Sequence, residues 1–244
     1  MNRALRAEWT KLRTARGTAM LPFLAAALTV GLGTAISATA APGTTSCAGG
    51  CDPVRISLSG VYLGQMAVVV LAVLVSTGEY HHGLLGTTLA ATPRRLTVFA
   101  AKAAAVTVAV LPAGLLGVAG SLLAGRILLP GNGFTAAYGY PALSLAGGSV
   151  LRAASGTVLY LGLVALLSFG LATALRHTTA AVTTVLGLLY LAPVLAQFVT
   201  SEPWHGWIEK YAPMTADLGV LAGYTGAALV LGAVLFISRD AGGW

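Results

Sequence analysis

The sequence predicts an all-α, polytopic membrane protein. Hydrophobic residues make up 57% of the 244 residues, against roughly 45–50% in average soluble domains, and charged residues make up only 9%. The apolar residues gather into six runs, each of the length, about 20 residues or more, that an α-helix needs to cross a bilayer. We therefore expect a six-helix transmembrane domain over residues 18–244, with spans at 18–40, 58–78, 97–125, 153–175, 178–199 and 215–237.

Basic residues are distributed unevenly among the connections between these runs. Ten of the fourteen Lys and Arg lie before the first run, after the last run, or at or near every second connection, and only four lie at the others. By the positive-inside rule the richer set is cytoplasmic, so we expect a multi-pass plasma-membrane protein with both termini in the cytoplasm. This distribution explains the net charge of +7 by membrane orientation, and no binding to nucleic acid is expected.

The first 17 residues form a basic leader. Leu5, Trp9 and Leu12 share one helical face and arginines and lysines cover the remainder, so residues 2–16 are predicted to form an interfacial amphipathic helix on the inner leaflet. An unstructured basic tail is the alternative. A cleaved signal peptide is less favoured, because the apolar run that follows is longer than the usual core of about 7–15 residues.

The first outer connection carries both cysteines of the chain, as Cys47-Ala-Gly-Gly-Cys51. An extracellular location permits oxidation and the two glycines allow a tight ring, so a small disulfide is predicted. Metal binding is disfavoured, because two cysteines and Asp52 fall short of the usual four zinc ligands.

Two further connections between the apolar runs differ in length and composition. Arg176 and His177 form a very short turn between the fourth and fifth runs, which predicts antiparallel neighbouring helices. Residues 201–213 instead contain two tryptophans and a tyrosine. That segment is either a re-entrant element or an aromatic belt at the headgroup level.

Catalytic and energy-coupling motifs are missing from the sequence. There is no Gly-x-x-x-x-Gly-Lys-Ser/Thr phosphate loop and no His-Glu-x-x-His motif, so no enzyme activity and no cofactor are expected in this chain. Glu79 and Lys102 lie near span ends, close enough to extend to water. With no carboxylate near mid-membrane, an ion-coupled carrier is disfavoured.

A polar segment interrupts the apolar chain after the second run, from Gly78 to Arg95. Its middle carries small and apolar residues that a helix would present on the cytoplasmic side. We expect a protein partner to bind there and bury them. An inner-leaflet helix without a partner is the alternative. His81 and His82 are adjacent, so they point to different faces of a helix and form no metal pair.

Several short motifs, taken in their order along the chain, resemble the ABC-2 type permeases of actinobacterial style. The resemblance extends over the whole chain, and each motif alone is weak. The similar stretches are residues 78–95 with Ala100-Ala101-Lys102, the opening 6–14, Leu159-Tyr160-Leu161, Leu175-Arg176-His177-Thr178, Tyr211-Ala212-Pro213 and Ser238-Arg239-Asp240-Ala241.

The resemblance implies the membrane subunit of an exporter for a hydrophobic or amphiphilic drug, lipid or peptide, as in multidrug or antibiotic resistance. Its implied partners are two ATPase subunits, which hold ATP and Mg²⁺, a second permease, identical or homologous, and membrane lipid. The other function class is a non-transporting scaffold or sensor subunit.

The resemblance also assigns roles to residues. Residues 81–95 would be the coupling helix that docks on the ATPase. The second and fifth spans would line the substrate path, where Gln65 and Gln197 are deep polar groups; a hydrogen bond between helices is the other interpretation of each. The docking residues would be Glu79, His81, His82, Leu84, Leu85, Thr88, Leu89, Arg94 and Arg95.

Overall fold

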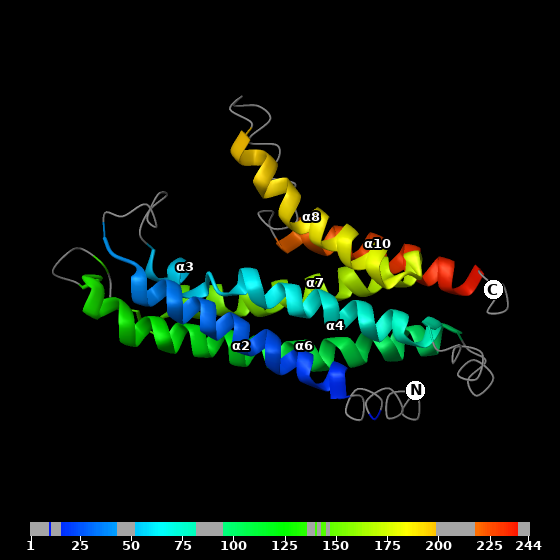
Figure 1. Cartoon of the computed structure of the whole chain (residues 1–244), viewed down its shortest axis with the longest axis horizontal. Coiled ribbons are helices and arrows are strands. Elements are labelled where there is room, and N and C mark those ends of the chain that lie inside the picture. Colours follow the sequence, from blue (N-terminus) through cyan, green and yellow to red (C-terminus); the bar gives the residue numbers. More distant parts are fainter. Residues whose placement is uncertain are drawn as a thin grey trace. The chain divides into compact units, whose positions relative to one another are not determined.

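The computed structural model describes residues 10, 16–42, 52–81, 95–135, 140, 143–144, 147–198 and 218–238, and all regular structure in these ranges is helical. Figure 1 labels the helices along the chain. They are α2 (Arg16–Thr39), α3 (Pro53–Leu58), α4 (Val61–His81), α6 (Arg95–Leu128), the 3-10 helix η2 (Leu129–Asn132), α7 (Gly148–Leu175), α8 (Thr178–Phe198) and α10 (Leu218–Ser238).

Five helical segments of the described chain are long and apolar enough to cross a membrane. The described apolar part of α8, Thr178–Leu191, is shorter than a span. Five of the six predicted spans therefore meet this criterion, and the remaining one, the fifth span at 178–199, which coincides with α8, stays a prediction. The five segments are Ala19–Thr39, Pro53–Gly78, Arg95–Asn132, Gly148–Leu175 and Leu218–Ser238.

Large apolar side chains on the outside of these helices agree with a membrane environment. Phe23 and Ile127 are 74% and 75% exposed, and each of the five segments carries other exposed hydrophobic residues. Hydrocarbon can cover such side chains at little cost, whereas large contiguous apolar patches are rare on soluble monomers. The chain is thus a helical, membrane-embedded protein.

The contacts of the chain divide it into two compact units. Unit 1 comprises residues 1–20, 68–109 and 162–244, and unit 2 comprises residues 21–67 and 110–161. Helices α4, α6 and α7 each contribute one part to each unit.

Unit 2 is held together by close packing around Thr29 of α2. A Cβ atom added at Gly60 would collide with the Thr29 carbonyl oxygen, and one at Gly64 would collide with the Thr29 hydroxyl. From α6, Ser121 donates a hydrogen bond to the same carbonyl at 3.0 Å, and Gly117 lies where an added Cβ would be 3.1 Å from the Thr29 Cβ. Small residues thus let the helix backbones approach closely, as is common between membrane helices.

Unit 1 has a similar close approach where α7 meets α10. A Cβ added at Gly170 would lie 2.7 Å from the Ala228 carbonyl, and one at Gly232 would lie 2.7 Å from the Gly170 carbonyl oxygen. The Thr225 hydroxyl lies 3.2 Å from the Leu163 carbonyl oxygen of α7 and 2.8 Å from the Leu221 carbonyl oxygen of its own helix, and it can donate to either. Only one narrow stripe of α10 is buried, and it consists of Leu221, Thr225, Ala228, Gly232 and Phe236.

The expectation that Lys102 extends to water is wrong. Its side chain is only 4% exposed. Helix α6 begins at Arg95, so Lys102 lies about two turns inside it. It shares the buried face of α6 with Val98, Ala101 and Ala105, and this face directs the side chain into unit 1.

Candidate functional site

The structure describes the helices on both sides of the predicted docking segment. Helix α4 ends at His81 and α6 begins at Arg95. The side chains of Glu79 and His81 lie outside the described part, although their backbone belongs to the last turn of α4. The predicted docking residues His82, Leu84, Leu85, Thr88, Leu89 and Arg94 lie outside the described residues altogether.

Two hydroxyl groups near the end of α4 bind neighbouring helices in unit 1. Ser76 Oγ lies 2.8 Å from Thr173 Oγ1 of α7, and Thr77 Oγ1 lies 2.8 Å from Thr178 Oγ1 of α8. Thr173 and Thr77 also lie within hydrogen-bond distance of a carbonyl oxygen in their own helix, and in each of the two pairs either hydroxyl can be the donor between helices. These bonds connect the end of α4 to the end of α7 and the start of α8.

The start of α6 binds the end of α10. Arg95 donates a hydrogen bond from Nη1 to the Ile237 carbonyl oxygen at 2.8 Å. One turn later, the ring of Phe99 lies 5.1 Å from that of Phe169 and 6.1 Å from that of Phe236, measured between centroids, with interplanar angles of 54° and 47°. All three rings are buried, so they form a tilted aromatic cluster joining α6, α7 and α10.

The turn between α7 and α8 completes this group of contacts. It consists of Arg176 and His177, so the predicted short turn is confirmed. Arg176 adopts a left-handed φ of 54°, and its Nη2 lies 3.4 Å from the Leu235 carbonyl oxygen of α10. His177 caps α8, because its Nδ1 accepts a hydrogen bond from the Ala180 backbone amide at 3.3 Å.

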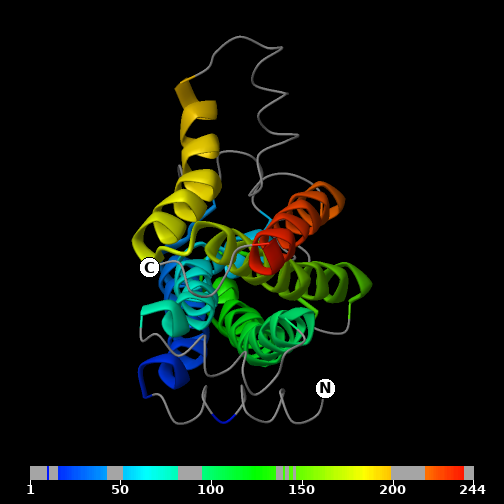
Figure 2. The same ribbon diagram turned by 90° about the vertical axis from the view of Figure 1, so that its right-hand side faces the viewer.

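We call this set of contacts the helix-end junction. Figure 1 shows the ends of α4 and α10 and the start of α6 on its right-hand side, and Figure 2 looks onto them. The sequence alone pointed only to Arg95 as a functional residue here, although hydroxyl residues near the ends of three apolar runs were a usable signal. The junction consists of Ser76, Thr77, Arg95, Phe99, Phe169, Thr173, Arg176, Thr178 and Phe236, with the carbonyl groups of Leu235 and Ile237.

Gln65, one of the two predicted path residues, lies in unit 2 and is fully buried. Its Oε1 accepts a hydrogen bond of 2.7 Å from the Tyr160 hydroxyl, which connects α4 to α7. Its Nε2 is buried without a hydrogen-bond partner among the described groups. Gln65 thus forms the helix-to-helix bond that was one of its two interpretations. The side chain of Gln197, on α8, lies outside the description.

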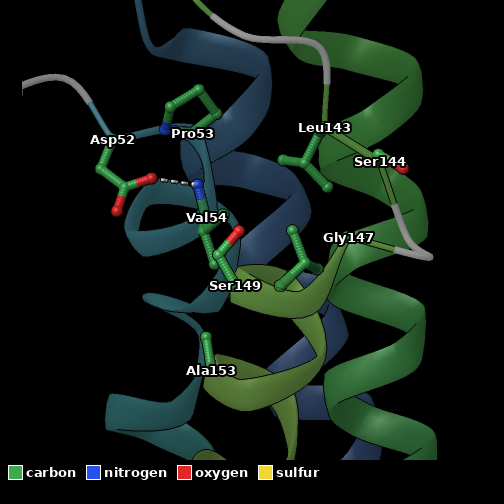
Figure 3. A pocket seen from close by; sticks show the side chains of 9 residues that line it. Asp52, Pro53, Val54, Leu143, Ser144, Gly147, Ser149 and Ala153 are labelled. Carbon is green, nitrogen blue, oxygen red and sulfur yellow. Dashed lines mark hydrogen bonds between the residues drawn. The ribbon is translucent and has the colours of Figure 1, made fainter.

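A pocket of about 230 Å³ opens in unit 2 between the start of α3 and the start of α7 (Figure 3). Asp52 stands at one side and Leu143 and Ser144 at the other, with Ser149 between them. The Asp52 carboxylate accepts a hydrogen bond from the Val54 amide at 2.9 Å and so caps α3. The Asp52 carboxylate at this pocket is thus explained by its role as the N-cap of α3.

The remaining sequence predictions fall on other parts of the chain. Cys47 and Cys51 lie outside the described residues, as does the leader except for Thr10, which is helical, and Arg16 and Gly17, which begin α2. Within the described ranges, no three His, Cys, Asp or Glu residues come together as a metal site would require.

The helix-end junction is therefore the part of the described structure that relates most directly to the predicted docking segment. It joins both flanks of that segment to three other helices. Comparisons of this chain with models of protein families, with curated proteins and with solved structures found no match.

Proposed function

We propose that this chain is the transmembrane permease subunit of an ATP-binding cassette exporter. It would move a hydrophobic or amphiphilic substrate across the plasma membrane, with both termini in the cytoplasm. ATP and Mg²⁺ would be held by two separate ATPase subunits, which would dock on residues 81–95. A second permease, identical or homologous, would complete the membrane part.

The observation that carries this proposal is the helix-end junction. A docking segment can transmit force only if its two ends are attached to other helices. Hydrogen bonds attach α4, just before the segment, to α7 and α8. Arg95, the last residue of the segment, and Phe99, one turn beyond it, attach the start of α6 to α7 and α10. A displacement of residues 82–94 would therefore reach five helices within unit 1.

The distribution of charge in the chain supports an external energy source. Four of the five apolar segments contain few ionisable residues, and no carboxylate lies among the residues described between Val98 and Phe198. An ion-coupled carrier is expected to place such groups near mid-membrane. Energy supplied through a docked ATPase requires no ionisable group inside the spans.

Purification of the full chain from its own membranes in mild detergent tests the proposal. We expect a P-loop ATPase to co-purify in an amount equal to the chain, identified by mass spectrometry and by ATP turnover of the complex. Leu85→Asp should remove the ATPase, since a buried, unpaired charge at a protein contact is costly. Arg152→Gln, at an exposed position in unit 2, is the control and should retain it.

Absence of any P-loop ATPase from the purified material would overturn the proposal in favour of the scaffold or sensor class. Retention of the ATPase by the Leu85→Asp variant would show that residues 81–95 are not the docking site.

A further inference from the structure

The end of α10 is an acceptor surface for two arginines from distant parts of the chain. The last four carbonyl groups of a helix have no partner inside the helix, and in α10 these belong to residues 235–238. Arg95 donates to the carbonyl of Ile237 at 2.8 Å, and Arg176 approaches that of Leu235 at 3.4 Å. Positive charge is favourable at this end, because the helix dipole makes it partly negative.

The two arginines belong to different connections. Arg95 is the first residue of α6 and the last residue of the predicted docking segment. Arg176 belongs to the two-residue turn between α7 and α8. Phe236 lies between the two acceptor residues in sequence and contacts Phe99, which is one turn beyond Arg95. The end of α10 is thus held by α6 through both a guanidinium group and an aromatic ring.

The backbone of Arg176 indicates that its side chain matters. Its φ of 54° lies in the left-handed region, which glycine adopts freely and other residues adopt at a cost. Glycine is the usual residue where a helix ends in this conformation. The contact of the Arg176 side chain with α10 is an interaction that glycine at this position would lack.

We propose that Arg95 and Arg176 are positioning residues that form one latch on the end of α10. While both are engaged, the start of α6, the α7–α8 turn and α10 move together. This inference rests on the proposed function, because it assigns α10 to the route by which ATPase closure reaches the membrane helices. Loss of either arginine loosens the end of α10, although the Phe99–Phe236 contact remains.

Hydrogen exchange on the full-length protein in lipid nanodiscs tests the latch without any ATPase. In Arg95→Gln and in Arg176→Gly, we expect the amides of the last turn of α10 to exchange about two- to fivefold faster than in the wild type. Glycine keeps the left-handed backbone, so the α7–α8 turn itself should exchange as before. The control Arg152→Gln changes an exposed arginine of unit 2 and should leave α10 unaffected.

The double variant distinguishes one latch from two separate contacts. If the latch is a single unit, the double variant exchanges less rapidly than the product of the two single effects. Unchanged exchange in both single variants, or strictly multiplicative effects, would overturn the latch.

ATP turnover of the assembled complex distinguishes a positioning role from a merely structural one. Arg176→Gly, which lies outside residues 81–95, should keep the ATPase bound but lose at least half of the turnover that the permease stimulates. Wild-type turnover together with faster exchange would show that the arginines only stabilise the end of α10. That result would overturn the inference. If no ATPase binds even the wild type, the proposed function fails, and the latch fails with it as a coupling device, whatever the exchange data show.

Discussion

Gly232→Ala is expected to destabilise unit 1 by about 1–3 kcal/mol, the usual cost of forcing extra atoms into a packed interface. An added Cβ would lie 2.7 Å from the Gly170 carbonyl oxygen and 3.3 Å from the Gly170 Cα. Both atoms belong to the backbone of α7, so no side-chain rotation can relieve the collision. The variant should separate α7 from α10 and lower the temperature at which the purified protein loses its folded, monodisperse state in detergent.

Gly226→Ala is the matched control on the same helix. No atom lies within 4 Å of a Cβ at this position, and the residue is exposed. Since alanine favours helix over glycine by about 0.5–1 kcal/mol, this variant should be as stable as the wild type or slightly more stable. Equal transition temperatures for the two variants would contradict the close α7–α10 contact.

Phe99→Ala is expected to have the other large effect, a loss of about 3–5 kcal/mol as is typical when a buried aromatic ring is removed. The ring is 8% exposed and contacts both Phe169 and Phe236. Its removal would leave a cavity where α6, α7 and α10 meet. The same detergent measurement should therefore show a marked fall in transition temperature.

Leu96→Ala controls for the loss of apolar area on the same helix. Leu96 is 57% exposed, so little packing is lost when it is shortened. A stability loss in Leu96→Ala equal to that in Phe99→Ala would show that the aromatic cluster adds nothing specific. Phe99→Leu should lie between the two, because it keeps much of the apolar volume.

The helical architecture was predictable because the length and composition of apolar runs decide which segments can cross lipid. The predicted span 18–40 and helix α2 (Arg16–Thr39) nearly coincide, as do span 215–237 and α10 (Leu218–Ser238). Helix α7 begins at Gly148 rather than at residue 153, because Arg152 continues the helix although it ends the apolar run. A charged residue indicates where the hydrocarbon part of the membrane ends, but the helix can continue beyond it.

The contacts within the helix-end junction were not predictable in the same way. Arg95 and Ile237 are 142 residues apart, and Ser76 and Thr173 are 97 residues apart. When every face of a helix is apolar, hydrophobic periodicity does not reveal which face is buried. Lys102 illustrates this, since its position near a span end suggested access to water but its helical face is the buried one.

Permease-stimulated ATP turnover in proteoliposomes tests the central claim most directly, namely that an ATPase drives this chain through residues 81–95 and the helix-end junction. With the wild-type chain, turnover should exceed that of the ATPase alone, and Leu85→Asp should return it to the level of the ATPase alone. The control variant Gly226→Ala should retain the stimulation. Stimulation that persists undiminished in Leu85→Asp, or that is absent with the wild-type chain, would contradict the claim.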